Sequence, residues 1–304
     1  MPTPSKQKKS LTTKTIKRKK QIKKRKKLFS LKQKISTLFC LFFLVSAFTY
    51  GYYLGGKNSK DLNQSTEKKI LVKELKVKTN KVHSVAKQCN KPKLVIIIDD
   101  IHTKSQLANI EALGLHITPS IFPPYKLAPN SHKLASNLKH FMIHLPMESK
   151  SKQLNSQYKT LKINYSDVSI KNRIAELRVL FPNAKYINNH TGSVFTSNYD
   201  SMSSAYAYMK KYKFKFVDSK TSKHTKVKQI AKEHKDKYVA RDVFLDNKRE
   251  IEYIKLQLKK AVSIAQKRGY AIAIGHPHYE TMKALASSKN ILDFVDVIYI
   301  DELF

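Results

Sequence analysis

Cysteine and glycine are scarce in this chain of 304 residues, which has two cysteines and seven glycines. Two thiols, Cys40 and Cys89, cannot build a disulfide framework or a cysteine-based zinc site. The sequence contains no G-x-G-x-x-G or G-x-x-x-x-G-K-[ST] string, which argues against the loops that cradle dinucleotides and nucleotide phosphates. Any bound metal must therefore be held by His, Asp or Glu side chains.

Acidic residues are also in short supply, because 22 Asp and Glu stand against 59 Lys and Arg and the formal net charge is +37. Residues 1–34 contain 15 of the basic residues and no acidic one. No folded pattern surrounds this basic head, so we interpret it as a signal for membrane topology and expect no nucleic-acid partner. With 41% apolar residues, the chain as a whole can still bury a core.

One long segment lacks charge altogether. Residues 35–56 (ISTLFCLFFLVSAFTYGYYLGG) give 22 consecutive positions without a charged side chain, and roughly 20 apolar residues suffice for a helix to cross the hydrocarbon. We predict an uncleaved transmembrane helix; a cleaved signal peptide is the competing interpretation, but no clear small-x-small cleavage site follows the run. The basic head then stays in the cytoplasm, which predicts a single-pass inner-membrane protein with a periplasmic or extracytoplasmic domain.

The rest of the chain divides into a polar, lysine-rich tether at 57–91 and one folded domain at 92–304. In the domain, short apolar runs alternate with helical patterns. Helices are expected at 168–181, 201–212 and 248–268, and strands at 94–99, 117–122, 141–147, 186–190, 214–218, 238–246, 271–276 and 295–300. This alternation predicts parallel strands with crossover helices, arranged as a distorted (β/α) barrel of seven or eight strands, with a doubly wound open sheet as the alternative.

Most of the expected strands end on aspartate or histidine. The residues at these ends are Asp99, Asp100, His144, His190, Asp218, Asp246 and His276. The carboxyl ends of parallel barrel strands meet on one face, where barrel enzymes carry their chemistry. One such residue alone is usually a helix cap or a hydrogen-bonded structural group, but the same signature on six of eight strands predicts a functional rim.

Carboxylates and imidazoles without thiols suit zinc or another divalent first-row metal. Three such ligands leave one coordination position open, and a neighbouring carboxylate and imidazole can then accept and return a proton. The residue types therefore predict hydrolysis of an amide or an ester. Adjacent side chains on a strand point to opposite faces, so Asp99 and Asp100 can both reach the site only at the end of their strand.

Six strings carry a family resemblance when they are taken in order: VIIIDD (95–100), HLPME (144–148), NNHTGS (188–193), FVDSKTS (216–222), RDVFLDN (241–247) and AIAIGHPH (271–278). Together they resemble the divergent polysaccharide deacetylase family, a branch of the NodB-homology carbohydrate esterases. The resemblance covers about residues 93–303. It implies a distorted (β/α) barrel and a metal-dependent hydrolase that removes N- or O-acetyl groups from a cell-envelope polysaccharide.

The same resemblance implies roles for individual residues. Asp99 is implied as the catalytic base and His276 as the general acid. Asp100 and His144 are implied as ligands of a divalent metal, for which we predict zinc. The usual second motif of the wider superfamily has two histidines four residues apart, and this sequence departs from it, because Glu148 stands four residues after His144.

The third metal ligand is therefore predicted to be His190, with Glu148 as a replacement ligand or as a hydrogen-bonding partner of the site. Arg241 is predicted to orient Asp99 through a charge-assisted hydrogen bond, and an ion pair on the rim is the alternative. Other rim residues are predicted to hold imidazoles, to bind sugar hydroxyls or to shape a substrate-binding turn: Asp218, Asp246 and Ser193.

Three functions remain as alternatives. The first is a membrane-anchored glycan deacetylase. The second is a catalytically silent glycan-binding or scaffold protein of the envelope on the same fold, which the departure at Glu148 favours. The third is a glycosidase that uses two of Asp99, Asp218 and Asp246 as its acid and base, and that leaves the histidines unexplained. In each case a cationic surface attracts anionic envelope polymers.

Overall fold

The structure is a computed structural model that describes residues 91–157 and 159–303. Its centre is one parallel sheet of eight strands, and their order along the sheet is β5-β4-β3-β2-β1-β7-β6, with β8 paired to β1 off this path. The strands are β1 (Lys93–Ile101), β2 (Thr118–Ile121), β3 (Met142–Met147), β4 (Tyr186–Thr191), β5 (Lys215–Val217), β6 (Val243–Phe244), β7 (Tyr270–Gly275) and β8 (Asp296–Ile298). All eight lie where the sequence predicts a strand.

The strand order is that of a (β/α) barrel cut open between β5 and β6. Consecutive strands are neighbours from β1 to β5, and β7 closes onto the other edge of β1. Across the cut, an isolated bridge joins Asp218 to Ala240. The sheet is thus a curled half-barrel. The predicted barrel is correct in topology and incomplete in closure, because β6 pairs over only two residues where nine were expected.

The side chains of β1 show how the sequence builds two layers. Val95 and Ile97 point into the curl of the sheet with Ile272 and Ile274 of β7. The residues between them, of which Ile96 is one, pack outward against the helices in the larger core cluster. All the residues from Leu94 to Ile98 are fully buried. An apolar run without alternation is what a strand covered on both faces requires.

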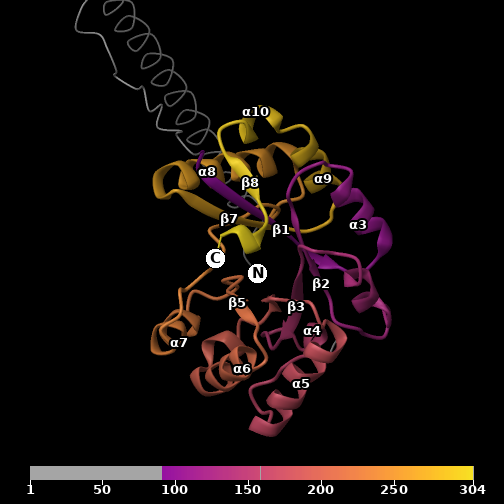
Figure 1. Cartoon of the computed structure of the whole chain (residues 1–304), viewed down its shortest axis with the longest axis vertical. Helices are drawn as coiled ribbons and strands as arrows, with labels where there is room; N and C mark the ends of the chain where they lie inside the picture. The colour runs from indigo at the N-terminus through magenta and orange to yellow at the C-terminus, as the bar shows by residue number, and fades with distance from the viewer. Residues whose placement is uncertain (1–90, 158, 304) are drawn as a thin grey trace, which may run out of the picture. The chain divides into compact units, whose positions relative to one another are not determined.

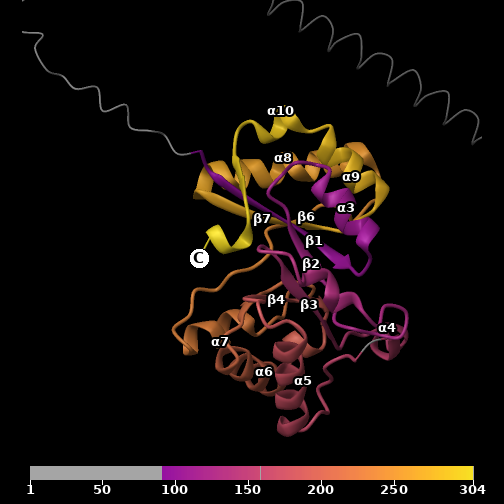
Figure 2. The ribbon, with the colours of Figure 1, turned by 45° about the vertical axis from the view of Figure 1, so that its right-hand side comes forward.

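The helices cover the outside of the curl. They are α3 (Lys104–Glu111), α4 (Lys152–Gln157), α5 (Asp167–Leu180), α6 (Tyr199–Lys211), α7 (Val227–Glu233), α8 (Ile251–Arg268), α9 (Tyr279–Ala286) and α10 (Lys289–Leu292). Helix α8 packs on β7 and α9, and α6 packs on α5 and β5 (Figures 1 and 2). Local signals set their ends: the Ser166 and Asn198 side chains cap α5 and α6, and Gly269, with φ of 90°, ends α8.

The C-terminal segment fills the end of the half-barrel opposite the strand carboxyl ends. Strand β8 pairs with the first residues of β1, and Ile298 and Ile300 join the interior cluster. The main-chain N–H of Ile300 donates to the buried Thr118 hydroxyl over 3.0 Å. The eighth strand therefore acts as a plug for the interior, and all the polar strand ends lie at the opposite face.

No helix within residues 91–157 and 159–303 has both the length and the apolar character needed to cross a bilayer. The predicted head at 1–34, the predicted span at 35–56 and residues 57–90 of the predicted tether lie outside the described residues.

Candidate active site

Strand geometry brings the first aspartate pair to the site by two different means. Asp99 follows Val95 and Ile97 in the alternation of β1, so its side chain points into the curl and is 3% exposed. Asp100 would point outward, but its φ of 62° lies in the left-handed region and the pairing of β1 with β2 shifts register there. This local break in the strand turns Asp100 toward the same face. Aspartate tolerates that conformation better than most residues.

His144 and His190 reach the same place by alternation on two neighbouring strands. On β3, Met142 points inward and so does His144; on β4, Tyr186 points inward and so does His190. The two strands are paired in register over these residues. Because the sheet is parallel, their carboxyl ends meet beside the end of β1.

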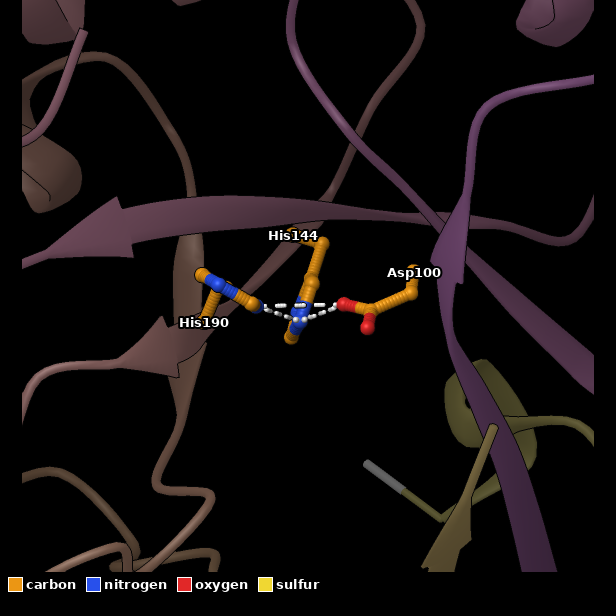
Figure 3. A group of neighbouring side chains, drawn as sticks. All are labelled: Asp100, His144 and His190. Atoms are coloured by element: carbon orange, nitrogen blue, oxygen red, sulfur yellow. Dashed lines mark hydrogen bonds and ion pairs between the residues drawn. The ribbon is translucent and has the colours of Figure 1, made fainter. Parts of the chain in front are cut away.

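Three side chains converge at this point, as Figure 3 shows. Asp100 Oδ1 lies 3.1 Å from His144 Nε2 and 3.1 Å from His190 Nδ1. The two imidazole nitrogens lie 3.2 Å apart. Tetrahedral coordination with zinc–ligand bonds of 2.0–2.1 Å places ligand atoms about 3.3 Å from one another. Asp100, His144 and His190 therefore fit a divalent metal in donor type and in spacing.

The protonation chemistry of the cluster also suits a cation. Burial would raise the pKa of Asp100, but hydrogen bonds with His144 and His190 hold that pKa well below its ordinary value, so the carboxylate is ionised. Burial lowers the pKa of His190, which favours the neutral ligand form. Burial would also lower the pKa of His144, yet the charges of Asp99 and Asp100 raise it. Without a cation, that extra proton balances the carboxylates.

A buried amide contacts both the metal cluster and the predicted base. Asn188, on β4, is 0% exposed and its Nδ2 donates to Asp99 Oδ1 over 2.7 Å. Its Oδ1 lies 2.8 Å from His144 Nδ1 and accepts from the Ser120 hydroxyl over 2.7 Å. The sequence analysis did not predict Asn188 and Ser120. Only the alternation of side chains along each strand places them on the inner face, and Asn and Ser carry no catalytic signature of their own.

His276, at the end of β7, is paired with Asp246 as predicted for a carboxylate that holds an imidazole. Asp246 Oδ1 lies 3.1 Å from His276 Nδ1, and Oδ2 accepts from the His276 main-chain N–H over 2.6 Å. Burial would lower the pKa of His276, but the hydrogen bond with Asp246 and the charge of Asp100 raise it to about 9. His276 Nε2 lies 3.8 Å from Asp100 Oδ2, so a protonated imidazole borders the metal cluster.

A second group of possible ligands consists of Asp246, His276 and His278. The oxygens of Asp246 are already committed, because Oδ2 accepts from Thr281 Oγ1 over 2.8 Å as well as from the His276 main chain. This group is better suited to hold a proton on His276 than to hold a metal.

Glu148 lies one residue beyond β3, and its carboxylate faces away from the three converging ligands. Its Oε2 accepts from the Ile163 N–H over 2.7 Å, and its main-chain oxygen accepts from the N–H groups of Val194 and Phe195. Within the described residues, the ligand group at this point is completed by His190 and does not include Glu148.

Arg241 is placed differently from the prediction. Its Nε donates to the Ser219 carbonyl over 2.6 Å and a terminal nitrogen donates to the Lys220 carbonyl over 2.9 Å. The guanidinium also lies 4.9 Å from the centre of the Phe244 ring. Among the described residues the amide that bonds Asp99 belongs to Asn188. The expected hydrogen bond to Asp99 is thus made by a neutral amide; Arg241 bonds the loop after β5 across the cut in the sheet and still interacts electrostatically with Asp99.

Asp218 and Ser193 lie in the loops that follow β5 and β4. Asp218 is fully buried and accepts from the Lys220 N–H, the Thr225 hydroxyl and the Tyr238 hydroxyl. It therefore organises its loop and does not hold an imidazole. The Ser193 carbonyl accepts from Ser197 Oγ in the turn after β4, as expected for a turn residue.

Aromatic rings form the wall on the β2 side of the site. The Phe122 ring meets the His144 ring at 5.1 Å and the His190 ring at 4.8 Å, edge to face in both cases. Tyr125 packs against Phe122 and His102. Burial raises the pKa of Tyr125, and the charge of Asp100 adds to that rise. This apolar wall limits the access of water to the His144 and His190 rings and strengthens the electrostatic interactions within the site.

The fold and the site together define an α/β half-barrel protein with a candidate His/Asp metal centre at the carboxyl ends of its strands. Residues 96–304 match the family described as divergent polysaccharide deacetylase. The chain belongs to this family, as its motifs predicted.

Two curated relatives carry no assigned function in their names. The uncharacterized protein YibQ of Escherichia coli K12 is 33% identical over 198 residues, which cover 64% of this chain and 61% of YibQ. An uncharacterized protein of Haemophilus influenzae is 30% identical over 217 residues, covering 70% of this chain and 76% of that protein. The match with YibQ thus spans about three fifths of that relative.

Among solved structures, the uncharacterized protein ATU2773 of Agrobacterium tumefaciens C58 superposes with a TM-score of 0.62 at 16% sequence identity. The match covers 71% of this chain and 91% of that one. This likeness shows a shared fold.

Proposed function

We propose that this protein is a metal-dependent hydrolase that removes acetyl groups from a cell-envelope polysaccharide. The observation that carries the proposal is the convergence of Asp100, His144 and His190 at ligand–ligand distances of 3.1–3.2 Å. Asp99 and His276 border this cluster and supply a carboxylate and a protonated imidazole. Membership of the divergent polysaccharide deacetylase family supports an acetylated glycan as the substrate class.

The residues divide the work of hydrolysis among them. Asp100, His144 and His190 would hold the divalent ion, which would supply Lewis-acid polarisation of the acetyl carbonyl. Asp99 accepts a proton from the attacking water, and its Oδ2 is available for this because its described contacts engage Oδ1. His276, with a pKa of about 9, is protonated at neutral pH and returns a proton to the leaving nitrogen or oxygen.

Two alternatives are less well supported. A glycosidase would need two available carboxylates, but Asp218 accepts three hydrogen bonds in the described structure and Asp246 holds His276 and Thr281. A silent binding protein on the same fold was favoured by the departure at Glu148. The group of Asp100, His144 and His190 could hold a metal without Glu148, which supports an active site over a silent one.

We also propose that residues 35–56 anchor the protein in the inner membrane and that the catalytic domain works outside the cytoplasm. The support is the run of 22 uncharged residues that follows a head with 15 basic residues. An acetylated envelope polymer would be within reach of a domain in that compartment.

The test is acetate release by the purified full chain from acetylated chitooligosaccharides, peptidoglycan and O-acetylated glycans. The proposal predicts release by the wild type with at least one of these substrates. Asp99→Asn should lose about 10²–10⁴-fold in kcat, the contribution of a general base, while it retains the bound metal. Release by neither protein, in samples that carry a full equivalent of metal, would point to a glycan-binding role instead.

A further inference from the structure

We infer that Asn188 is the positioning residue of this site and that it joins the base Asp99 to the metal ligand His144 through one buried amide. This inference rests on the proposed function for what Asp99 does. The contact between Asn188 and His144 is independent of the proposed function.

The polarity of the network identifies which end of the amide faces which partner. The Ser120 hydroxyl donates to Asn188 Oδ1 over 2.7 Å, and His144 Nδ1 lies 2.8 Å from the same oxygen. A carboxylate oxygen can only accept, so the carbonyl oxygen of Asn188 faces Ser120 and His144 and its NH₂ group faces Asp99. That group donates to Asp99 Oδ1 over 2.7 Å. Ser120, itself fully buried, thus fixes the orientation of the amide.

The carbonyl end of the amide determines which nitrogen of His144 is available to a metal. A hydrogen bond from Nδ1–H to Asn188 Oδ1 places the ring proton on Nδ1. Nε2 then presents its lone pair to Asp100 Oδ1 and His190 Nδ1, which lie 3.1 and 3.2 Å away. A ligating histidine generally donates its other N–H in this way, and the loss of that partner typically costs 10–100-fold in metal affinity.

The NH₂ end of the Asn188 side chain determines how Asp99 presents its carboxylate. Asn188 Nδ2 holds Oδ1, and His144 Nδ1 lies 3.5 Å from that same oxygen. Asp99 is 3% exposed and Asn188 is 0% exposed, so water does not compete for either contact. Oδ2 is therefore the oxygen directed to the reacting water. A neutral amide thus orients Asp99 by a hydrogen bond alone and adds no charge of its own beside the carboxylate.

Strand pairing explains why one side chain can serve both partners. Asn188 lies directly opposite His144 in the β3–β4 register, and Ser120 lies on β2, the next strand toward β1. All of them point into the curl, as Asp99 does. The amide therefore spans from β4 across to β1 beneath the metal cluster.

Two substitutions at position 188 separate the two halves of this role. In Asn188→Asp, a carboxylate still accepts from His144 Nδ1–H, but it replaces the amide donor with a second carboxylate against Asp99, so the two carboxylates must share a proton and Asp99 is no longer a free base. In Asn188→Leu, both contacts are lost with little change in volume. Ser120→Ala removes the group that orients the amide. Thr118→Val is the matched control, since Thr118 lies on the same strand, is equally buried and accepts from the Ile300 N–H at the plugged end of the half-barrel.

The experiment measures zinc affinity by competition with a chromogenic chelator, and kcat and KM for acetate release, on each full-length variant. We expect Asn188→Asp to bind zinc within about threefold of wild type, and Asn188→Leu to bind about 10–100-fold more weakly. We expect kcat to fall at least about 100-fold in Asn188→Asp with KM nearly unchanged. Ser120→Ala should show a smaller loss in both quantities, and Thr118→Val should lose stability without a change in either.

Equal zinc affinity in Asn188→Leu and wild type would overturn the hold on His144. A kcat within threefold of wild type in Asn188→Asp would overturn the hold on Asp99. If the wild type binds zinc but releases no acetate, the proposed function fails, and the affinities of the two position-188 variants still decide the hold on His144. Should Asn188→Leu not fold, the zinc affinity of Ser120→Ala tests the hold on His144, and kcat of Asn188→Asp still tests the hold on Asp99.

Discussion

The Asp246 carboxylate binds His276 at two points: Oδ2 lies 2.6 Å from the main-chain nitrogen and Oδ1 lies 3.1 Å from the ring Nδ1. The main-chain bond fixes the position of the residue, and the ring bond stabilises the imidazolium. Together with the charge of Asp100, this contact outweighs burial and raises the pKa of His276 to about 9.

Asp246→Asn should therefore move the alkaline limb of the pH–rate profile to lower pH. Activity that requires protonated His276 is lost as the pH rises through its pKa, and an amide in place of the carboxylate stabilises the protonated ring less. The measurement is kcat/KM for acetate release across pH 5–10, which for the free enzyme reports its essential acid and base. An unchanged alkaline limb would show that another group supplies the acid.

His190→Ala should weaken zinc binding by more than about 100-fold, since it removes a ligand and not merely a partner of a ligand. Glu148→Gln should bind zinc within about threefold of wild type, because the Glu148 carboxylate bonds the Ile163 N–H outside the cluster. Chelator competition on the two variants measures both affinities. The reverse order of effects would identify Glu148 as the third ligand.

Asp218→Ala should destabilise the protein by about 2–4 kcal/mol while it leaves zinc affinity unchanged. Asp218 is the shared acceptor of three donors, and its loss leaves them unsatisfied in a fully buried position. Urea unfolding gives the stability and chelator competition gives the affinity. A loss of metal without a loss of stability would instead place Asp218 at the metal centre.

Ile300→Ala should cost about 3 kcal/mol in unfolding free energy, because it opens a cavity in the interior cluster that the C-terminal segment plugs. Leu256→Ala on α8 is the control, since Leu256 is 61% exposed and its substitution should stay within about 0.5 kcal/mol of wild type. Equal effects in thermal or urea unfolding would argue against the plug.

The sequence predicted the strands well because burial leaves a direct trace in an apolar run. VIIIDD marks β1 and AIAIG marks β7, and the position of the polar residues at the carboxyl ends follows from parallel geometry alone. The extent of β6 was wrong, since an apolar pattern reports burial and not whether a neighbouring strand is within pairing distance.

The three side chains proposed as metal ligands were named from residue type and position, whereas the contacts between them were not predicted. The left-handed conformation of Asp100, which turns it toward the cluster, follows from no residue pattern. Arg241 was expected at Asp99 through a charge-assisted hydrogen bond, yet Asn188 donates to Asp99 from β4, across the curl of the sheet. Such a contact depends on the register of β3 against β4, which the sequence alone does not specify.

The central claim is that a single metal at Asp100, His144 and His190 supports deacetylation. The most direct measurement depletes the purified full chain of metal with a chelator and follows acetate release as zinc is added back. Activity should rise linearly and reach its plateau at one equivalent of bound zinc, and Asp100→Ala should neither bind the metal nor recover activity. Acetate release that persists at full rate in the metal-depleted wild type would contradict it.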